Sequence, residues 1–142
     1  MKRQIVIVLQ GKGEMGKSTT LYYLIQALKN KKPYDDFDRY DKCDVIYYKD
    51  KKIGVTTSGD NKDKLKRDIE KNLPENCDII VCAARTKGSS VDYINDHFKK
   101  DLIIWLGRFS ATSDNKDFNM DELQKSTNEW QAEKIKDIID NL

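Results

Sequence analysis

Apolar residues follow two patterns along this chain, and each pattern predicts one kind of secondary structure. A continuous apolar run at residues 5–9 indicates a strand covered on both faces of a sheet, and largely apolar runs at 77–84 and 101–106, which contain Asp78 and Asp101, indicate two further core strands. Apolar residues spaced by three or four positions indicate amphipathic helices, and they occupy residues 18–28, 61–73, 91–100 and 121–142. The alternation of strands with helices predicts an α/β fold.

Two further short strands are predicted at 44–48 and 52–57, with only residues 49–51 between them. A crossover helix needs about a dozen residues, so these two strands should pair as an antiparallel hairpin. The chain is therefore expected to form a three-layer α/β/α sheet that is mostly parallel. We predict the strand order 2-3-1-4-5, with the hairpin at one edge.

Composition narrows the class of protein. The sequence has 142 residues, 38% hydrophobic and 35% charged, with a formal net charge of +2. These values suit a single domain over residues 1–142 in a very soluble, cytoplasmic protein. The nearly balanced charge gives no sign of a nucleic-acid partner, and no apolar run is long enough for a signal peptide or a membrane span. Three cysteines without a C-x-x-C pair and one histidine predict neither a disulfide framework nor a zinc site.

The loop between the first strand and the first helix carries the clearest candidate chemistry. It fits the pattern G-x-x-x-x-G-K-[ST], whose glycines let backbone N–H groups converge on a polyphosphate. The helix that follows adds unpaired N–H groups and the positive end of its dipole. The predicted binding residues are Gly11, Lys12, Gly13, Glu14, Met15, Gly16, Lys17, Ser18 and Thr19.

With this loop between a strand and a helix, residues 4–28 resemble the P-loop NTPases. The resemblance implies that Lys17 contacts the β- and γ-phosphates and that Ser18 Oγ ligates Mg²⁺. The loop also resembles the deviant Walker A of partitioning and septum-site ATPases, in which an early lysine reaches the phosphates of a partner subunit. Lys12 stands at that position, whereas Glu14 replaces the usual glycine. A homodimer with Lys12 acting in trans is one interpretation, and a variable loop residue is the other.

Two residues at predicted strand ends complete the candidate site. In P-loop domains, the strand beside the phosphate-loop strand ends in an aspartate that orients the water shell of Mg²⁺, and Asp60 is the candidate for this role. The alternative is that Asp60 belongs to a turn and helix cap. Arg85 follows the strand at 77–84 and could pair with the γ-phosphate, because ligands bind beyond the carboxyl ends of parallel strands. Its alternative role is to cap a helix or to pair with a surface aspartate.

Other segments offer weaker signals. Asp35, Asp36 and Asp38 could belong to a switch-like loop or to a solvated one. The basic residues of the helix at 61–73 are interleaved with acids, so we expect a solvated face. No guanine-reading motif follows the strand at 101–106, which leaves adenine as the default base. The polar loop at 111–120 could lie over the base.

These signals predict Mg²⁺-dependent binding of a nucleoside triphosphate, with ATP as the default nucleotide and slow hydrolysis as the default reaction. Lys17 and Arg85 would stabilise charge on the phosphates, while Ser18 and Asp60 would hold the metal. One alternative is phosphoryl transfer to a small acceptor, in the manner of nucleoside and nucleotide kinases. A second alternative is a non-catalytic module that dimerises on binding a nucleotide.

Overall fold

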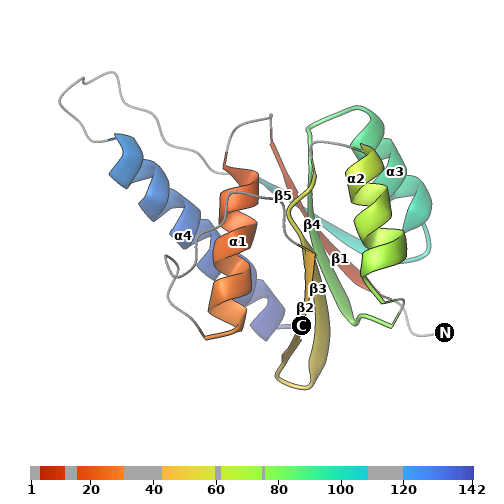
Figure 1. Cartoon of the computed structure of the whole chain (residues 1–142), viewed down its shortest axis with the longest axis horizontal. Coiled ribbons are helices and arrows are strands. Elements are labelled where there is room, and N and C mark those ends of the chain that lie inside the picture. The colour runs from red at the N-terminus through yellow and green to blue at the C-terminus, as the bar shows by residue number, and fades with distance from the viewer. Residues whose placement is uncertain (1–3, 12–15, 31–42, 60–61, 75, 109–119) are drawn as a thin grey trace.

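The apolar runs of the sequence form one five-stranded sheet in the computed structural model (Figure 1). The structure describes the chain except for residues 1–3, 12–15, 31–42, 60–61, 75 and 109–119. The strands are β1 (Ile5–Gln10), β2 (Cys43–Tyr48), β3 (Lys51–Thr56), β4 (Ile79–Ala84) and β5 (Leu102–Gly107). The helices are α1 (Lys17–Leu28), α2 (Lys62–Arg67), α3 (Ser89–His97) and α4 (Met120–Asp140), and α2 continues into a π-helical turn, η1 (Asp68–Asn72).

Helices lie on both faces of the sheet, with α1 and α4 on one face and α2 and α3 on the other (Figure 1). Each face has its own apolar core. Ile7, Leu9 and Val81 point toward α1 and α4, whereas the alternate residues Val6 and Val8 point toward α2 and α3. This alternation confirms that the central strands are covered on both sides, as their continuous apolar runs predicted. In the described part of the chain, no helix is long and apolar enough to cross a membrane.

The pairing of the strands is confirmed in part. β2 and β3 form the predicted antiparallel hairpin at one edge, and β3, β4, β1 and β5 run parallel to one another. The predicted order 2-3-1-4-5 is wrong, because the observed order is β2-β3-β4-β1-β5. β4 takes the central place that we expected for β1. The burial pattern gives the physical reason, because every residue of β4 is buried while both ends of β1 are partly exposed.

The parallel strands bring their carboxyl ends to the same edge of the sheet. Gly11 follows β1 at this edge, and its N–H donates to Ala84 O at the end of β4 over 3.2 Å. On the other side, the N–H of Arg108 after β5 donates to Gln10 O over 2.6 Å. The phosphate-loop pattern therefore begins between the ends of β4 and β5.

Candidate functional site

The loop after β1 returns to the described part of the chain at Gly16, which precedes α1. Gly16 has a φ of 80°, in the left-handed region that favours glycine, and its C=O accepts the Thr20 N–H over 2.9 Å. A Cβ atom on Gly16 would lie 2.9 Å from Asn128 Oδ1 and 3.0 Å from Arg108 Nη2. Conformation and space both require glycine here, where the first N–H groups of α1 have no acceptor within the helix. The intervening candidates, Lys12, Gly13, Glu14 and Met15, lie outside the described residues.

Lys17 lies inside the turn that it helps to form. Its side chain is only 4% exposed, and Nζ donates a hydrogen bond of 2.7 Å to Gly11 O. The first and last parts of the motif are therefore joined by a buried ammonium group. Thr19 is the next but one residue in α1 and is half-buried.

Ser18 connects the start of α1 to the segment that follows β3. Ser18 is exposed, and its Oγ donates to Thr57 O over 3.0 Å. β4 lies between β3 and β1. Ser18 can therefore reach Thr57 only if the segment that follows β3 passes close to the end of β4. Gly59 permits that approach, because a Cβ atom there would lie 2.2 Å from the backbone C and O of Ala83. Asp60, the predicted metal residue, follows Gly59 and lies outside the described residues.

A buried carboxylate holds the segment that follows β3. Asp68 is 4% exposed, and its Oδ2 accepts hydrogen bonds from Thr56 Oγ1 over 2.8 Å and from Ser58 Oγ over 2.5 Å. Its Oδ1 accepts from Asn72 Nδ2 over 2.7 Å. The helix at 61–73 was expected to present a solvated charged face, and for Asp68 that expectation is wrong. The π-helical turn that begins at Asp68 accompanies this inward placement, and such turns often occur at functional sites.

Arg85 lies where the sequence predicted it, directly after β4 and beside the start of the loop. Its side chain is exposed. Its N–H donates to Ser90 Oγ over 3.3 Å, and its C=O accepts from Gln10 Nε2 over 3.4 Å. These contacts fix the backbone of Arg85 next to the end of β1.

A second arginine, which was not among the predicted site residues, flanks the loop on the opposite side. Arg108 follows β5, and a Cβ atom on Gly11 would lie 2.9 Å from Arg108 Cβ. Its Nη1 donates to Gln131 Oε1 over 3.0 Å, and its Nη2 donates to Asn128 Oδ1. Its buried Nε has no hydrogen-bond partner in the described part of the chain. Burial lowers the pKa of the guanidinium, and the described residues supply neutral amides rather than a carboxylate to balance it.

The two amides come from α4 and join three elements around Arg108. Asn128 Oδ1 also accepts from Thr20 Oγ1 of α1 over 3.3 Å, and Gln131 Nε2 donates to Gly107 O over 2.9 Å. Both amide residues are buried. A signal for Arg108 was present in the sequence, because it ends an apolar strand in the same manner as Arg85. No local pattern marked Asn128 or Gln131.

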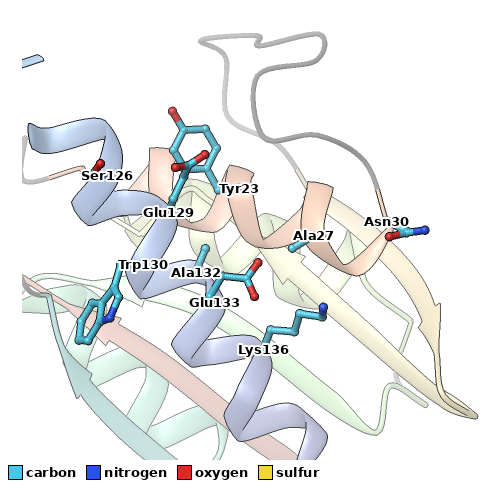
Figure 2. A pocket seen from close by; sticks show the side chains of 9 residues that line it. All are labelled: Tyr23, Ala27, Asn30, Ser126, Glu129, Trp130, Ala132, Glu133 and Lys136. Atoms are coloured by element: carbon cyan, nitrogen blue, oxygen red, sulfur yellow. The ribbon is translucent and has the colours of Figure 1, made fainter. Parts of the chain in front are cut away.

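A separate hollow of about 500 Å³ lies between α1 and α4 (Figure 2). Among the described residues that line it, two glutamates, Glu129 and Glu133, stand with one lysine, Lys136, so these side chains would repel a polyphosphate. Burial, followed by the charge of Glu129, raises the pKa of Tyr23. The lining residues are Tyr23, Ala27, Asn30, Ser126, Glu129, Trp130, Ala132, Glu133 and Lys136. The loop edge of the sheet is therefore the better candidate for an anion site.

Comparisons with known proteins gave no match, whether to a family model, to a curated protein or to a solved structure.

Proposed function

We propose that this chain binds a nucleoside triphosphate, with ATP as the default, together with Mg²⁺ at the loop between β1 and α1. We further propose that it hydrolyses the nucleotide slowly. One observation carries the proposal, and it concerns the start of α1. Gly16 precedes the helix with a left-handed backbone conformation, and the buried Lys17 donates a hydrogen bond from Nζ to Gly11 O. This arrangement places a cation within one turn of the first N–H groups of a helix, which have no acceptor inside the helix.

The chemistry of the loop suits a phosphate chain. Phosphate oxygens carry negative charge and accept stronger hydrogen bonds than a peptide carbonyl does. Lys17 Nζ, now bonded to Gly11 O, would therefore transfer to the β- and γ-phosphates when a triphosphate binds. The N–H groups at the start of α1 would donate to the same phosphates.

The residues beside Ser18 suit Mg²⁺ held mainly by the nucleotide. Mg²⁺ prefers oxygen ligands and commonly keeps several waters while it binds phosphate oxygens. Ser18 is exposed at the start of α1, and its Oγ lies 3.0 Å from the carbonyl oxygen of the buried residue Thr57. In the described ranges, no three His, Cys, Asp or Glu side chains are grouped as a metal site. Asp60 is still predicted to orient the water shell of Mg²⁺. Bound Mg²⁺ would neutralise charge on the β- and γ-phosphates.

Arginines on both sides of the loop would add to this neutralisation. Arg85 and Arg108 follow the two strands that pair with β1. In a transfer of the γ-phosphoryl group, such cations stabilise charge that develops on the phosphate oxygens. We assign no residue to orient the attacking water, and for this reason we expect turnover to be slow.

Titration calorimetry with ATP and Mg²⁺ tests the proposal. Lys17→Met keeps the buried alkyl chain and removes the ammonium group, so we expect nucleotide affinity to fall by about a hundredfold. Lys29→Ala is the matched control, because it removes a lysine directly after the other end of α1, where Lys29 pairs with Asp44. It should bind as the wild type does. Absence of uptake by the wild type, or equal uptake by Lys17→Met, would contradict the proposal.

A further inference from the structure

β5 forms one outer edge of the sheet and has backbone groups that point away from β1. The N–H of Leu102 donates to Gln4 O, and the N–H of Arg108 donates to Gln10 O. In a parallel pair, alternate residues bond to the neighbouring strand, so Ile103 and Trp105 direct their N–H and C=O groups outward. Among the described residues, no strand pairs with this side of β5.

The two edges of the sheet differ in how they are protected. Edge strands are commonly protected by charged side chains, especially lysine. The hairpin edge has such protection, because Asp44 of β2 pairs with Lys29 and the lysine Lys52 lies 5.8 Å from the ring of exposed Tyr47. β5 carries no charged residue over its whole length, which reads Leu-Ile-Ile-Trp-Leu-Gly. Leu102 is 47% exposed, and the four apolar residues after it are only partly covered.

We propose that two copies of this chain pair antiparallel through β5, so that one sheet continues across a two-fold axis at Ile104. A two-fold axis between antiparallel strands stands perpendicular to the sheet, and each residue must then face a residue of the same sheet face. With the axis at Ile104, Ile103 of one copy faces Trp105 of the other. Both residues have outward backbone groups, so each of the two symmetric pairs would exchange both N–H···O bonds.

This register also matches the side chains. Leu102 would face Leu106 of the second copy, and Ile104 would face its own equivalent, so every pair from 102 to 106 is apolar. If the axis lay at Ile103 instead, Asp101 would face Trp105 of the second copy. The only hydrogen-bonded pair of apolar residues would then be Ile103 with its own equivalent. The apolar pairing and the outward backbone groups therefore favour the same axis.

The contact is narrow, so we expect a weak dimer that forms with rising concentration. Interfaces at the small end of the observed range are usually transient. The pairing uses no nucleotide and no residue of the loop. Failure of this inference would leave the nucleotide proposal standing, and failure of nucleotide binding would leave this inference standing.

Sedimentation equilibrium of the wild-type chain, from about 1 to about 200 µM, tests the pairing. We expect a reversible monomer–dimer equilibrium within that range. Ile103→Pro removes an outward N–H and no bond to β1, a position where proline is tolerated on an edge strand, and it should weaken the dimer at least about tenfold. Leu102→Lys adds a charge at the edge and should act likewise if the proline variant does not fold. Tyr47→Lys, at the opposite edge, is the control and should leave the dimer unchanged.

Cross-linking tests the register. Side chains directly opposite each other at a position without hydrogen bonds have Cβ atoms about 4.5–5.5 Å apart, near the distance that a disulfide spans. Ile104→Cys should therefore form a disulfide dimer under mild oxidation, while Ile103→Cys should not. The native thiols are poor competitors, because burial raises the pKa of Cys43 and of Cys82 to about 12. A monomer at every concentration, or a dimer lost in Tyr47→Lys and kept in Leu102→Lys, would overturn the inference.

Discussion

The two sides of the phosphate-loop pattern place an arginine at the same point and surround it differently. Arg85 follows β4 with an exposed side chain, and its backbone C=O and N–H bond to Gln10 and Ser90. Arg108 follows β5, is half-buried, and directs its guanidinium to two amide oxygens of α4. Water screens the charge of Arg85, whereas Arg108 acts in a medium of lower effective dielectric constant. One sequence pattern, an arginine after an apolar strand, therefore gives two cations of different electrostatic strength.

The sides also differ in the groups that accompany each arginine. On the β4 side, the segment after β3 crosses the strand end at Gly59 and supplies Thr57 O to Ser18. On the β5 side, α4 supplies the side-chain amides that hold Arg108. The β4 side therefore places a hydroxyl and a carbonyl oxygen at the start of α1, and the β5 side carries a partly desolvated cation suited to an anion. A metal-bound triphosphate lying across the loop would meet both.

The largest effect is expected where the β4 side is most crowded. Gly59→Ala would place a Cβ atom 2.2 Å from the backbone of Ala83. The backbone must move to accept it, so we expect a loss of about 3 kcal/mol in the free energy of unfolding. Gly107→Ala is the matched control on the β5 side, because a Cβ atom there would meet nothing within 4 Å. Urea unfolding of both variants is the measurement. If Gly59→Ala and Gly107→Ala had equal free energies of unfolding, Gly59 would not lie in close contact with the backbone of β4.

A smaller loss is expected from the carboxylate that fixes the same segment. Asp68→Asn removes the charge that receives the Thr56 and Ser58 hydroxyl groups. Hydrogen bonds to a buried charged group contribute more than neutral ones, so the variant should lose about 2 kcal/mol of stability. Asp63→Asn, on the exposed side of α2, should change stability by less than about 0.5 kcal/mol. Thermal unfolding would separate the two, and an unchanged midpoint for Asp68→Asn would contradict its structural role.

Nucleotide affinity tests whether Arg108 is the electrostatically stronger of the two arginines. Arg108→Gln should weaken ATP binding about tenfold, and Arg85→Gln should weaken it about threefold, because solvent screens the exposed charge. Raising the salt concentration from about 50 mM to about 500 mM should reduce the effect of Arg85→Gln more than that of Arg108→Gln. Calorimetry at both concentrations gives the answer. A larger effect at Arg85 would reverse our ranking of the two sides.

The smallest effect concerns the far end of α4, the helix that holds Arg108. Asp140 accepts hydrogen bonds from Tyr48 and Lys49 of the hairpin, which lower the pKa of its carboxyl group in the folded protein. A lowered folded-state pKa gives stability that is present above the unfolded-state value and is lost as pH falls through the folded value. Asp140→Asn should therefore lower the melting temperature slightly at pH 7. At pH 2.5 the melting temperatures of variant and wild type should lie closer together, and a constant difference between the two pH values would contradict the assignment.

The sequence predicted the elements of the fold well and their order incompletely. Continuous apolar runs located β1, β4 and β5, and the short link at 49–51 predicted the hairpin. The order failed because β1 and β4 have nearly the same local pattern, and their places depend on how completely each is buried. The strand order depends in part on Gly59 and Ala83, which are far apart in the sequence. Both residues must be small for the segment after β3 to cross the end of β4.

The candidate site was predictable where the residues are contiguous. One motif contained Gly11, Gly16, Lys17 and Ser18, and the structure brings them together. Arg85 lies beside the loop because its strand pairs with β1, although its chemical role stays a prediction. Asp68 and Asn128 were missed, because their partners lie many positions away in the sequence. Whether Asp35, Asp36, Asp38 and Asp60 have the predicted roles is untested, since all four lie outside the described residues.

A crystal structure with Mg²⁺ and a non-hydrolysable ATP analogue would show whether the loop after β1 binds the triphosphate. We expect phosphate oxygens within hydrogen-bond distance of the N–H groups at the start of α1, with Lys17 Nζ moved from Gly11 O to the β- and γ-phosphates. We also expect Mg²⁺ next to Ser18 Oγ. A nucleotide bound elsewhere, with Lys17 still bonded to Gly11 O, would contradict nucleotide binding at this loop.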